Sequence, residues 1–276
     1  MQPGEPSRTA LGAATHRAVH QVLEQGRIFT DPLAGRILGP EAALAARRAE
    51  GDATQRQLRL FIAVRTRFAE DALRTAFARG ARQLVVLGAG LDTYAYRNPL
   101  GQDLDIYEVD HPDTQQWKRR LLAEAAIPVP DNLTYVPVDF ECETLEDGLT
   151  LEGFDPGKRT FFTWLGVVPY LAEETVFSTL AFIASLPGGA QVVFDYGNPP
   201  GATPSAVMDT LERRVASVGE HLRSRFETED LHARLRDLGF RAIEDLGPAG
   251  IRNRFFAGRG GAPLERGGHI LLATSG

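Results

Sequence analysis

The sequence has few of the features that mark several other classes of protein. Its 276 residues include one cysteine, Cys142, which argues against an internal disulfide and a cysteine-based zinc site. No apolar run approaches the ~20 residues that span a bilayer, and the first residues lack the basic-then-apolar order of a signal peptide. The formal net charge of -6 disfavours a surface built to bind phosphates. We therefore expect a cytoplasmic protein without nucleic-acid or membrane partners.

Two phosphate-binding signatures are also missing. The Walker loop, G-x-x-x-x-G-K-[ST], does not occur. The dinucleotide fingerprint, G-x-G-x-x-G, fails at its third glycine, where the chain has Thr93, and Asp92 would turn a negative charge towards the phosphates. No Tyr-x-x-x-Lys pair stands out as a hydride site. A nicotinamide-dependent oxidoreductase is therefore the weaker alternative among enzymes.

The most informative stretch is QLVVLGAGLDTYAYR. Residues 84–87 form a wholly apolar run, typical of a strand buried on both faces of a parallel sheet, and it leads into Gly88-Ala89-Gly90. Glycines at this point allow a ligand to approach the backbone closely. A second run ends in Asp110, about twenty residues on, where nucleoside-binding α/β folds hold a ribose hydroxyl pair. The two strand ends predict a nucleoside cofactor without phosphates, and S-adenosylmethionine (SAM) is the obvious candidate.

Apolar periodicity and turn signals predict an α/β fold with a mostly parallel, seven-stranded sheet. We expect residues 1–80 to be a helical lid on a core at 81–276, the two forming one compact domain. A helical insertion is expected at about 203–224, between strands five and six, and a surface loop at 247–268. The expected strands are 84–88, 104–109, 133–138, 159–164, 190–196, 240–246 and 269–274, and the expected helices are 10–25, 40–49, 53–79, 117–126, 175–186 and 228–238.

The helix expected at 53–79 contains an arginine within its apolar stripe. Arg65 falls among the buried positions, whereas Arg67, some 200° further round the helix, does not. A buried guanidinium needs an anionic partner, because an unpaired charge is costly away from water. Two interpretations stay open: an internal salt bridge or snorkelling side chain, or a fork for a ligand carboxylate such as the methionine end of SAM.

Seven short segments lie in order between Ser7 and Pro199, namely SRTALGAATHRAVHQ, RTRFAEDAL, LVVLGAGLDTYAYR, YEVDHP, VPVDF, FFTWLGVVPYL and VVFDYGNP. Together they resemble the leucine carboxyl methyltransferase-like family, and in particular its bacterial branch of SAM-dependent O-methyltransferases. The resemblance covers nearly the whole chain, from about Ser7 to Leu272. The triplet LGAGLDT, EVD and VDF at these spacings is specific. The resemblance implies a class I methyltransferase fold, with a Rossmann-like sheet and N-terminal helices over the cofactor.

The resemblance also implies a cofactor site. Arg65 would hold the SAM carboxylate, Asp110 the ribose hydroxyls, and Asp139 with Phe140 the adenine. From the residues alone, Asp139 would instead be a helix N-cap or a solvated acid. Eukaryotic relatives have a glutamate after the fourth strand, where this chain has Leu165, so backbone carbonyls near Thr163 would replace that contact. The full expected set is Arg65, Gly88, Ala89, Gly90, Asp110, His111, Asp139, Phe140 and Thr163.

SAM carries a methyl group that a nucleophile attacks in line, so the enzyme mainly positions the acceptor and excludes water. A carboxylate acceptor is ionised at neutral pH, whereas a phenol would benefit from a base. The leading interpretation is methyl transfer to a small-molecule carboxylate in secondary or specialised metabolism. The alternatives are a hydroxyl acceptor and a SAM-binding protein without turnover.

No catalytic residue is assigned. The weak candidates for a base are Tyr170, Tyr196, His111 and Asp195, each near a predicted strand end. The acceptor contacts that we expect are Arg8, Thr9, Arg17, Trp164 and Tyr196. His16 and His20 share a helix spacing seen in metal sites, but they have no apparent carboxylate partner, so no metal is expected. The chain would act as a monomer or homodimer.

Overall fold

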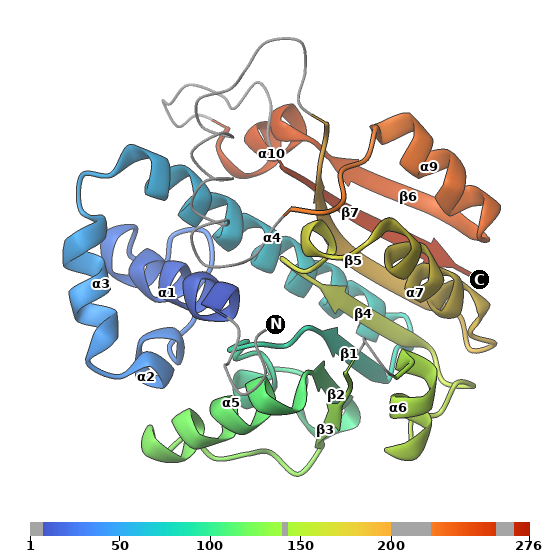
Figure 1. Ribbon diagram of the computed structural model, residues 1–276, viewed down its shortest axis with the longest axis horizontal. Helices are drawn as coiled ribbons and strands as arrows, with labels where there is room; N and C mark the ends of the chain where they lie inside the picture. The colour runs from blue at the N-terminus through green and yellow to red at the C-terminus, as the bar shows by residue number, and fades with distance from the viewer. Residues whose placement is uncertain (1–7, 140–142, 200–221, 258–267) are drawn as a thin grey trace. The chain divides into compact units, whose positions relative to one another are not determined.

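The computed structural model describes residues 8–139, 143–199, 222–257 and 268–276, with the side chains at positions 8, 53 and 54 excepted. Within these residues the chain is a mixed α/β protein (Figure 1). It divides into two compact units. Unit 1 comprises Met1–Glu70 and Leu84–Phe154, and unit 2 comprises Asp71–Gln83 and Asp155–Gly276.

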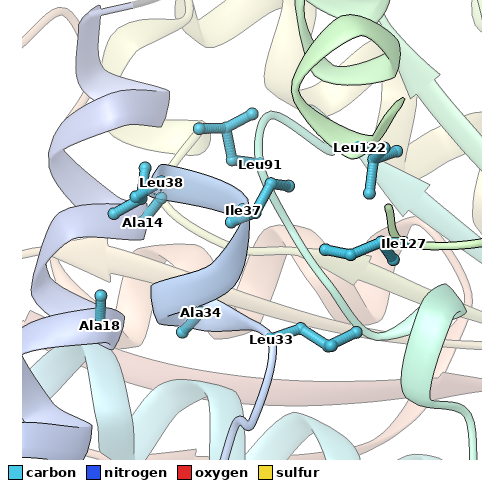
Figure 2. Close-up of a cluster of buried hydrophobic side chains, with 9 residues drawn as sticks. All are labelled: Ala14, Ala18, Leu33, Ala34, Ile37, Leu38, Leu91, Leu122 and Ile127. Atoms are coloured by element: carbon cyan, nitrogen blue, oxygen red, sulfur yellow. The ribbon is translucent and has the colours of Figure 1, made fainter. Parts of the chain in front are cut away.

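Four helices open the chain, and their small and branched apolar side chains form a core in unit 1. They are α1 (Arg8–Leu23), α2 (Ala34–Leu38), α3 (Glu41–Ala49) and α4 (Ala53–Ala78), whose last turns belong to unit 2. Figure 2 shows one buried cluster, to which α1, α2, α5 and the loop after β1 contribute. Its members are Ala14, Ala18, Leu33, Ala34, Ile37, Leu38, Leu91, Leu122 and Ile127. The N-terminal helices therefore share a core with the loop after β1.

Three strands follow in unit 1, and buried apolar residues specify them. β1 (Gln83–Leu87) is buried at every position, which a strand covered on both faces requires. β2 and β3 pair in parallel, from Ile106 opposite Leu133 to Asp110 opposite Pro137. The remaining elements are η1 (Ala95–Arg97), η2 (Gly101–Asp103), β2 (Asp105–Asp110), α5 (Pro112–Glu124), β3 (Leu133–Pro137) and α6 (Leu145–Leu151).

Unit 2 holds the remaining strands, of which β4 and β5 pair in parallel and β7 is antiparallel to β5 and β6. Tyr196, near the carboxyl end of β5, lies opposite His269, near the start of β7. The elements are β4 (Thr160–Trp164), η3 (Val168–Tyr170), α7 (Glu173–Ser185), β5 (Ala190–Gly197), α9 (Thr228–Asp237), β6 (Phe240–Leu246), α10 (Pro248–Phe255) and β7 (Gly268–Ser275).

The described residues form one seven-stranded sheet in the order β3-β2-β1-β4-β5-β7-β6. This confirms the predicted fold class and all seven predicted strands. None of the helices in the described part of the chain has the length and apolar character to cross a membrane.

Three predictions about helices were wrong. The surface loop expected at 247–268 contains α10, because Pro248 occupies its first turn, where proline costs no hydrogen bond. The same effect of Pro112 starts α5 five residues earlier than predicted. The short α6 was missed, although Thr144 caps it by accepting a hydrogen bond from the Asp147 N–H. The helical insertion expected at about 203–224 lies outside the described residues up to position 221.

Candidate functional site

The loop after β1 is a hydrogen-bonded turn built on two glycines. Gly88 and Gly90 have φ values of +63° and +47°, in the left-handed region that side chains disfavour. The Ala89 N–H donates to the Val109 carbonyl of β2 at 3.1 Å, and the Asp92 N–H returns to the Ala89 carbonyl at 2.7 Å. The loop is therefore fixed to the carboxyl end of β2.

Asp110 joins the end of β2 to this loop. Its Oδ2 accepts from the Gly90 N–H at 2.5 Å, and its Oδ1 accepts from the His111 N–H at 2.7 Å. Burial raises the pKa of the Asp110 carboxyl, and these two N–H groups together with the charges of Lys118 and His111 oppose the rise. Each carboxylate oxygen has a second lone pair, so the group can still accept from a ligand hydroxyl.

Helix α1 packs directly on the glycine loop. A Cβ at Gly90 would lie 2.9 Å from the Ala10 Cβ and 3.6 Å from the Ala10 Cα. The sequence indicated that Gly90 makes room for a ligand. In the structure the missing side chain of Gly90 makes room for α1.

Side chains from α1 and from the segment before α2 contact residues of the loop after β1. Arg17 Nη2 donates to the Leu91 carbonyl, and Arg17 Nη1 lies 3.7 Å from Asp92 Oδ2. Asp31 is 1% exposed; its Oδ2 accepts from Thr93 Oγ1 at 2.6 Å and lies 3.8 Å from Arg17 Nε. The opposite charges lie close enough to stabilise one another.

Arg97 extends this network to α4. Its guanidinium pairs with Glu70 through both terminal nitrogens, and its Nε donates to Thr93 Oγ1 at 3.1 Å. Burial raises the pKa of Glu70, although Arg97 opposes the rise. The glycine loop and the turn after it are thus held by residues of α1, of the segment before α2 and of α4, as well as by β2.

A second buried network lies beside β2. Lys118 Nζ of α5 bonds to Glu108 Oε2 at 2.7 Å, and both side chains are 1% exposed. Tyr96 donates to Glu108 at 3.2 Å and shares a 2.8 Å contact with the Tyr135 hydroxyl. Burial raises the pKa of Glu108, with Lys118 opposing, and burial together with Glu108 raises that of Tyr96 far above its ordinary value. This network joins α5 and β3 to the strand that carries Asp110.

The other expected cofactor residues of unit 1 have varied surroundings. Arg65 is buried and Arg67 is exposed, which confirms the helical periodicity argument. Asp139 is half-buried, and its N–H donates to Glu143 Oε2 at 2.9 Å. His111 caps α5, since its Nδ1 accepts from the Asp113 N–H at 3.2 Å. Phe140 and the side chain of Arg8 lie outside the described residues, while Thr9 is half-buried in α1.

In unit 2, the expected residues lie at the carboxyl ends of β4 and β5. Thr163 and Trp164 of β4 lie opposite Val193 and Phe194 of β5. Asp195 and Tyr196 follow directly on β5. Trp164 is 2% exposed, with its ring edge-on to Phe194 at 6.5 Å between centroids. Asp195 Oδ1 accepts from the N–H of Gly166 at 2.6 Å, which fixes the turn after β4 that contains Leu165. Tyr170 is half-buried in η3.

Tyr196 belongs to a polar cluster that the sequence did not predict. Its hydroxyl donates to Asp245 Oδ2 at 2.5 Å and lies 3.1 Å from His269 Nδ1. His269 Nδ1 is 2.8 Å from Asp245 Oδ1, and His232 Nε2 is 2.9 Å from Asp245 Oδ2. Burial acts to raise the pKa of Asp245, but bonds from His269, Tyr196 and His232 lower it overall. Asp245 is thus held ionised and orients two imidazoles.

This cluster changes which residue is the better candidate base. Burial and the hydrogen bond to Asp245 raise the pKa of Tyr196 far above its usual range, so its hydroxyl stays neutral. The His269 ring stacks on Tyr196 at 4.7 Å and lies over Gly247, where a Cβ would be 2.8 Å from its Cε1. Its Nδ1 faces Asp245, and its Nε2 makes no hydrogen bond with the described residues. His269 was missed because nothing in the sequence links it to Asp245.

The structure supplies no metal centre among the residues it describes, since they contain no group of three or more His, Cys, Asp or Glu side chains suited to hold an ion. The expectation that His20 has no carboxylate partner was wrong. His20 Nδ1 lies 3.3 Å from Glu24 Oε2, one helical turn further on. Glu24 also accepts from Arg59 Nε at 2.7 Å and Nη2 at 2.8 Å, so this carboxylate pairs α1 with α4.

Comparison with known proteins identifies the family. The family model described as leucine carboxyl methyltransferase matches residues 10–184. The chain belongs to this family. It is 32% identical over 287 residues to YktD of Bacillus subtilis strain 168, named as an S-adenosyl-L-methionine-dependent methyltransferase, and the match covers 94% of each chain.

A second relative agrees with this family, and a solved structure agrees with the fold. A Frankia alni protein with the same kind of name is 35% identical over 198 residues, covering 67% of this chain and 66% of its own. The structure of a methyltransferase from Thermobifida fusca YX superposes with a TM-score of 0.56 at 16% identity, covering 99% of this chain and 96% of its own. At that identity the structural match supports the fold alone.

Proposed function

We propose that this protein transfers the methyl group of SAM to an oxygen atom of a small-molecule acceptor. Its family membership identifies it as a SAM-dependent methyltransferase. The observation that carries the proposal for the site is the bond between Asp110 and the Gly90 N–H, which joins the glycine turn to the acid at the end of β2. A nucleoside without phosphates suits this turn, because it presents backbone atoms and a carboxylate rather than cationic side chains.

The residues of unit 1 would each bind one part of the cofactor. Asp110 accepts from the ribose hydroxyls, and the backbone around Gly88 and Gly90 contacts the ribose and methionine portions. Arg65 forms the ion pair with the methionine carboxylate, and Asp139 accepts from the adenine amino group. SAM supplies the electrophilic methyl group. The chain's own task is to hold the cofactor and acceptor in line and to exclude water.

Replacing Arg65 with leucine should weaken binding of S-adenosylhomocysteine (SAH) by roughly ten- to a hundredfold, because hydrogen bonds to a charged group contribute ~1.5–3 kcal/mol. Isothermal titration calorimetry measures the change. Arg67→Leu, on the exposed side of the same helix, is the matched control and should bind SAH as the wild type does. Equal affinity in all three proteins would assign Arg65 to an internal salt bridge.

We place a carboxylate first among acceptors. It is already ionised at neutral pH, so methyl transfer needs only positioning, and the C–S bond breaks as the carboxylate oxygen forms the new C–O bond. No proton moves in this reaction. The family description, leucine carboxyl methyltransferase, names the same class of acceptor for the family.

A hydroxyl acceptor is the second candidate. In this case a base takes the hydroxyl proton, the oxygen attacks the methyl carbon, and the C–S electron pair stays on sulfur. The protonated base then releases its proton to water. Within unit 2, the Asp245–His269 pair has the composition of such a base, since Asp245 Oδ1 lies 2.8 Å from His269 Nδ1.

The pH dependence of methyl transfer distinguishes the two acceptors. With a panel of small carboxylates and phenols, SAH release should be independent of pH between about 6 and 8 for a carboxylate, since that group is fully ionised there. For a hydroxyl, the rate should fall towards acidic pH, because a general base must be unprotonated to act. A pH-independent rate would exclude the hydroxyl mechanism.

A further inference from the structure

We propose that Arg17 is a positioning residue of the cofactor site, and that α1 sets the shape of the glycine loop through it. The inference rests on the proposed function, because it takes the loop after β1 as the place where SAM binds. On sequence grounds Arg17 was expected to orient an acidic substrate, and α1 to be part of a lid. The contacts of Arg17 point instead to the backbone that holds the cofactor.

The guanidinium of Arg17 contacts the glycine loop at two residues, Leu91 and Asp92. One terminal nitrogen donates to the Leu91 carbonyl, and the other lies 3.7 Å from Asp92 Oδ2. Leu91 directly follows Gly90, whose N–H is bound to Asp110. A shift of the Leu91 peptide therefore moves the Gly90 N–H and the carboxylate that would receive the ribose. Arg17 is 8% exposed, so little water is available to replace its contacts.

Asp31 fixes Arg17 from the other side. Its Oδ1 accepts from the Leu33 and Ala34 N–H groups at 3.0 Å each, which satisfies the start of α2. Its Oδ2 faces both Arg17 Nε and the Thr93 hydroxyl. One buried carboxylate thus ties the segment between α1 and α2 to the far end of the glycine loop. The loop is held between β2 on one side and the N-terminal helices on the other.

Arg17 also stabilises the ionised form of the buried Asp92 carboxylate. Burial acts to raise the pKa of Asp92, but Arg17, then Lys118 and Arg97, and the Tyr94 N–H lower it overall. The Tyr94 N–H donates to Asp92 Oδ1 at 2.7 Å, so the ionised carboxylate also closes the turn. Without Arg17 the Asp92 carboxylate loses its principal positive partner. The turn would then shift to bring this carboxylate to water or to other hydrogen-bond donors. The sequence suggested that Asp92 faces the ligand, whereas its charge is turned towards α1.

The test compares SAH affinity in Arg17→Met with that in Arg59→Met. Arg59 of α4 is also buried, 2% exposed against 8% for Arg17, and it pairs with Glu24; none of its hydrogen bonds among the described residues reaches the glycine loop. Both variants lose a buried ion pair and should unfold at lower temperature. Only Arg17→Met should weaken SAH binding, by about tenfold or more, as expected for losing one charge-assisted hydrogen bond and its ion pair.

A third variant isolates the effect of charge. Arg17→Met/Asp92→Asn removes the uncompensated charge but keeps an acceptor for the Tyr94 N–H, so it should recover part of the lost affinity. If Arg17→Met fails to fold, Arg17→Lys keeps the charge without the fork and should show an intermediate affinity. Wild-type affinity in the Arg17 variants, or equal losses in Arg17→Met and Arg59→Met, would overturn the proposal. Failure of the wild-type protein itself to bind SAH would instead refute the proposed function.

Discussion

Asp110→Ala should lower the affinity for SAH by about two to four orders of magnitude, more than any other single change in unit 1. Two hydrogen bonds from the ribose to an ionised carboxylate contribute ~1.5–3 kcal/mol each. The substitution also leaves the Gly90 N–H without the acceptor that it has at 2.5 Å, so the glycine loop loses its bond to that side chain. Calorimetric titration with SAH measures the loss of affinity. Thermal unfolding of the free protein measures how far the substitution destabilises the glycine loop.

Asp110→Asn separates the two effects of Asp110. Asparagine has nearly the same size and keeps one oxygen that can accept from the Gly90 N–H, but it lacks the charge and the second acceptor. We expect the unfolding temperature of this variant to approach that of the wild type, while SAH binding stays at least about tenfold weaker. SAH affinity that survives both substitutions would remove Asp110 from the ribose role. The glycine loop would then need another ligand.

Gly90→Ala should cost the free protein about 2–4 kcal/mol of folding stability, which is large for the addition of one methyl group. The φ of +47° disfavours any side chain, and the new Cβ would lie 2.9 Å from the Ala10 Cβ. Neither atom belongs to a flexible side chain, so α1 or the loop must move. Denaturant unfolding measures the loss, and SAH titration reports whether the loop remains in place.

Gly153→Ala is the matched control for the backbone strain. Gly153 follows the C-cap of α6 and also has a positive φ, +78°, but a Cβ there would meet nothing within 4 Å. Its cost should therefore be limited to about 1–2 kcal/mol of conformational strain. Ala10→Gly in the Gly90→Ala background should recover the steric part. If Gly90→Ala and Gly153→Ala were equally destabilising, α1 would not be packed on the loop as the structure has it.

The strands could be predicted because each is specified locally. Residues 84–87 are apolar without interruption, and the glycines after them end the strand, so one short window contains the whole signal. The same applies to β5 and β7. Helices with glycine or proline inside their bounds were harder to predict from the sequence. α10 contains Pro248 and Gly250, which predict a loop until the proline is recognised as a first-turn residue.

The partners of the site residues could not be predicted, because they depend on contacts between distant positions. Arg17 and Leu91 are 74 residues apart, and Tyr196 and His269 are 73 apart. No spacing rule joins such pairs before the topology is known. The sequence correctly placed Arg65 in a buried stripe and Gly90 beside Asp110, since those inferences need only one helix or two adjacent strand ends. The cofactor roles of these residues stay predictions.

The central claim is that the glycine loop and Asp110 hold SAM. Calorimetric titration of the purified protein with SAH, with NADH and NADPH in parallel, tests it most directly. We predict one site per chain with micromolar affinity for SAH and no heat of binding for either nicotinamide. A preference for NADH or NADPH, or no binding of SAH to a folded protein, would contradict the account of this site.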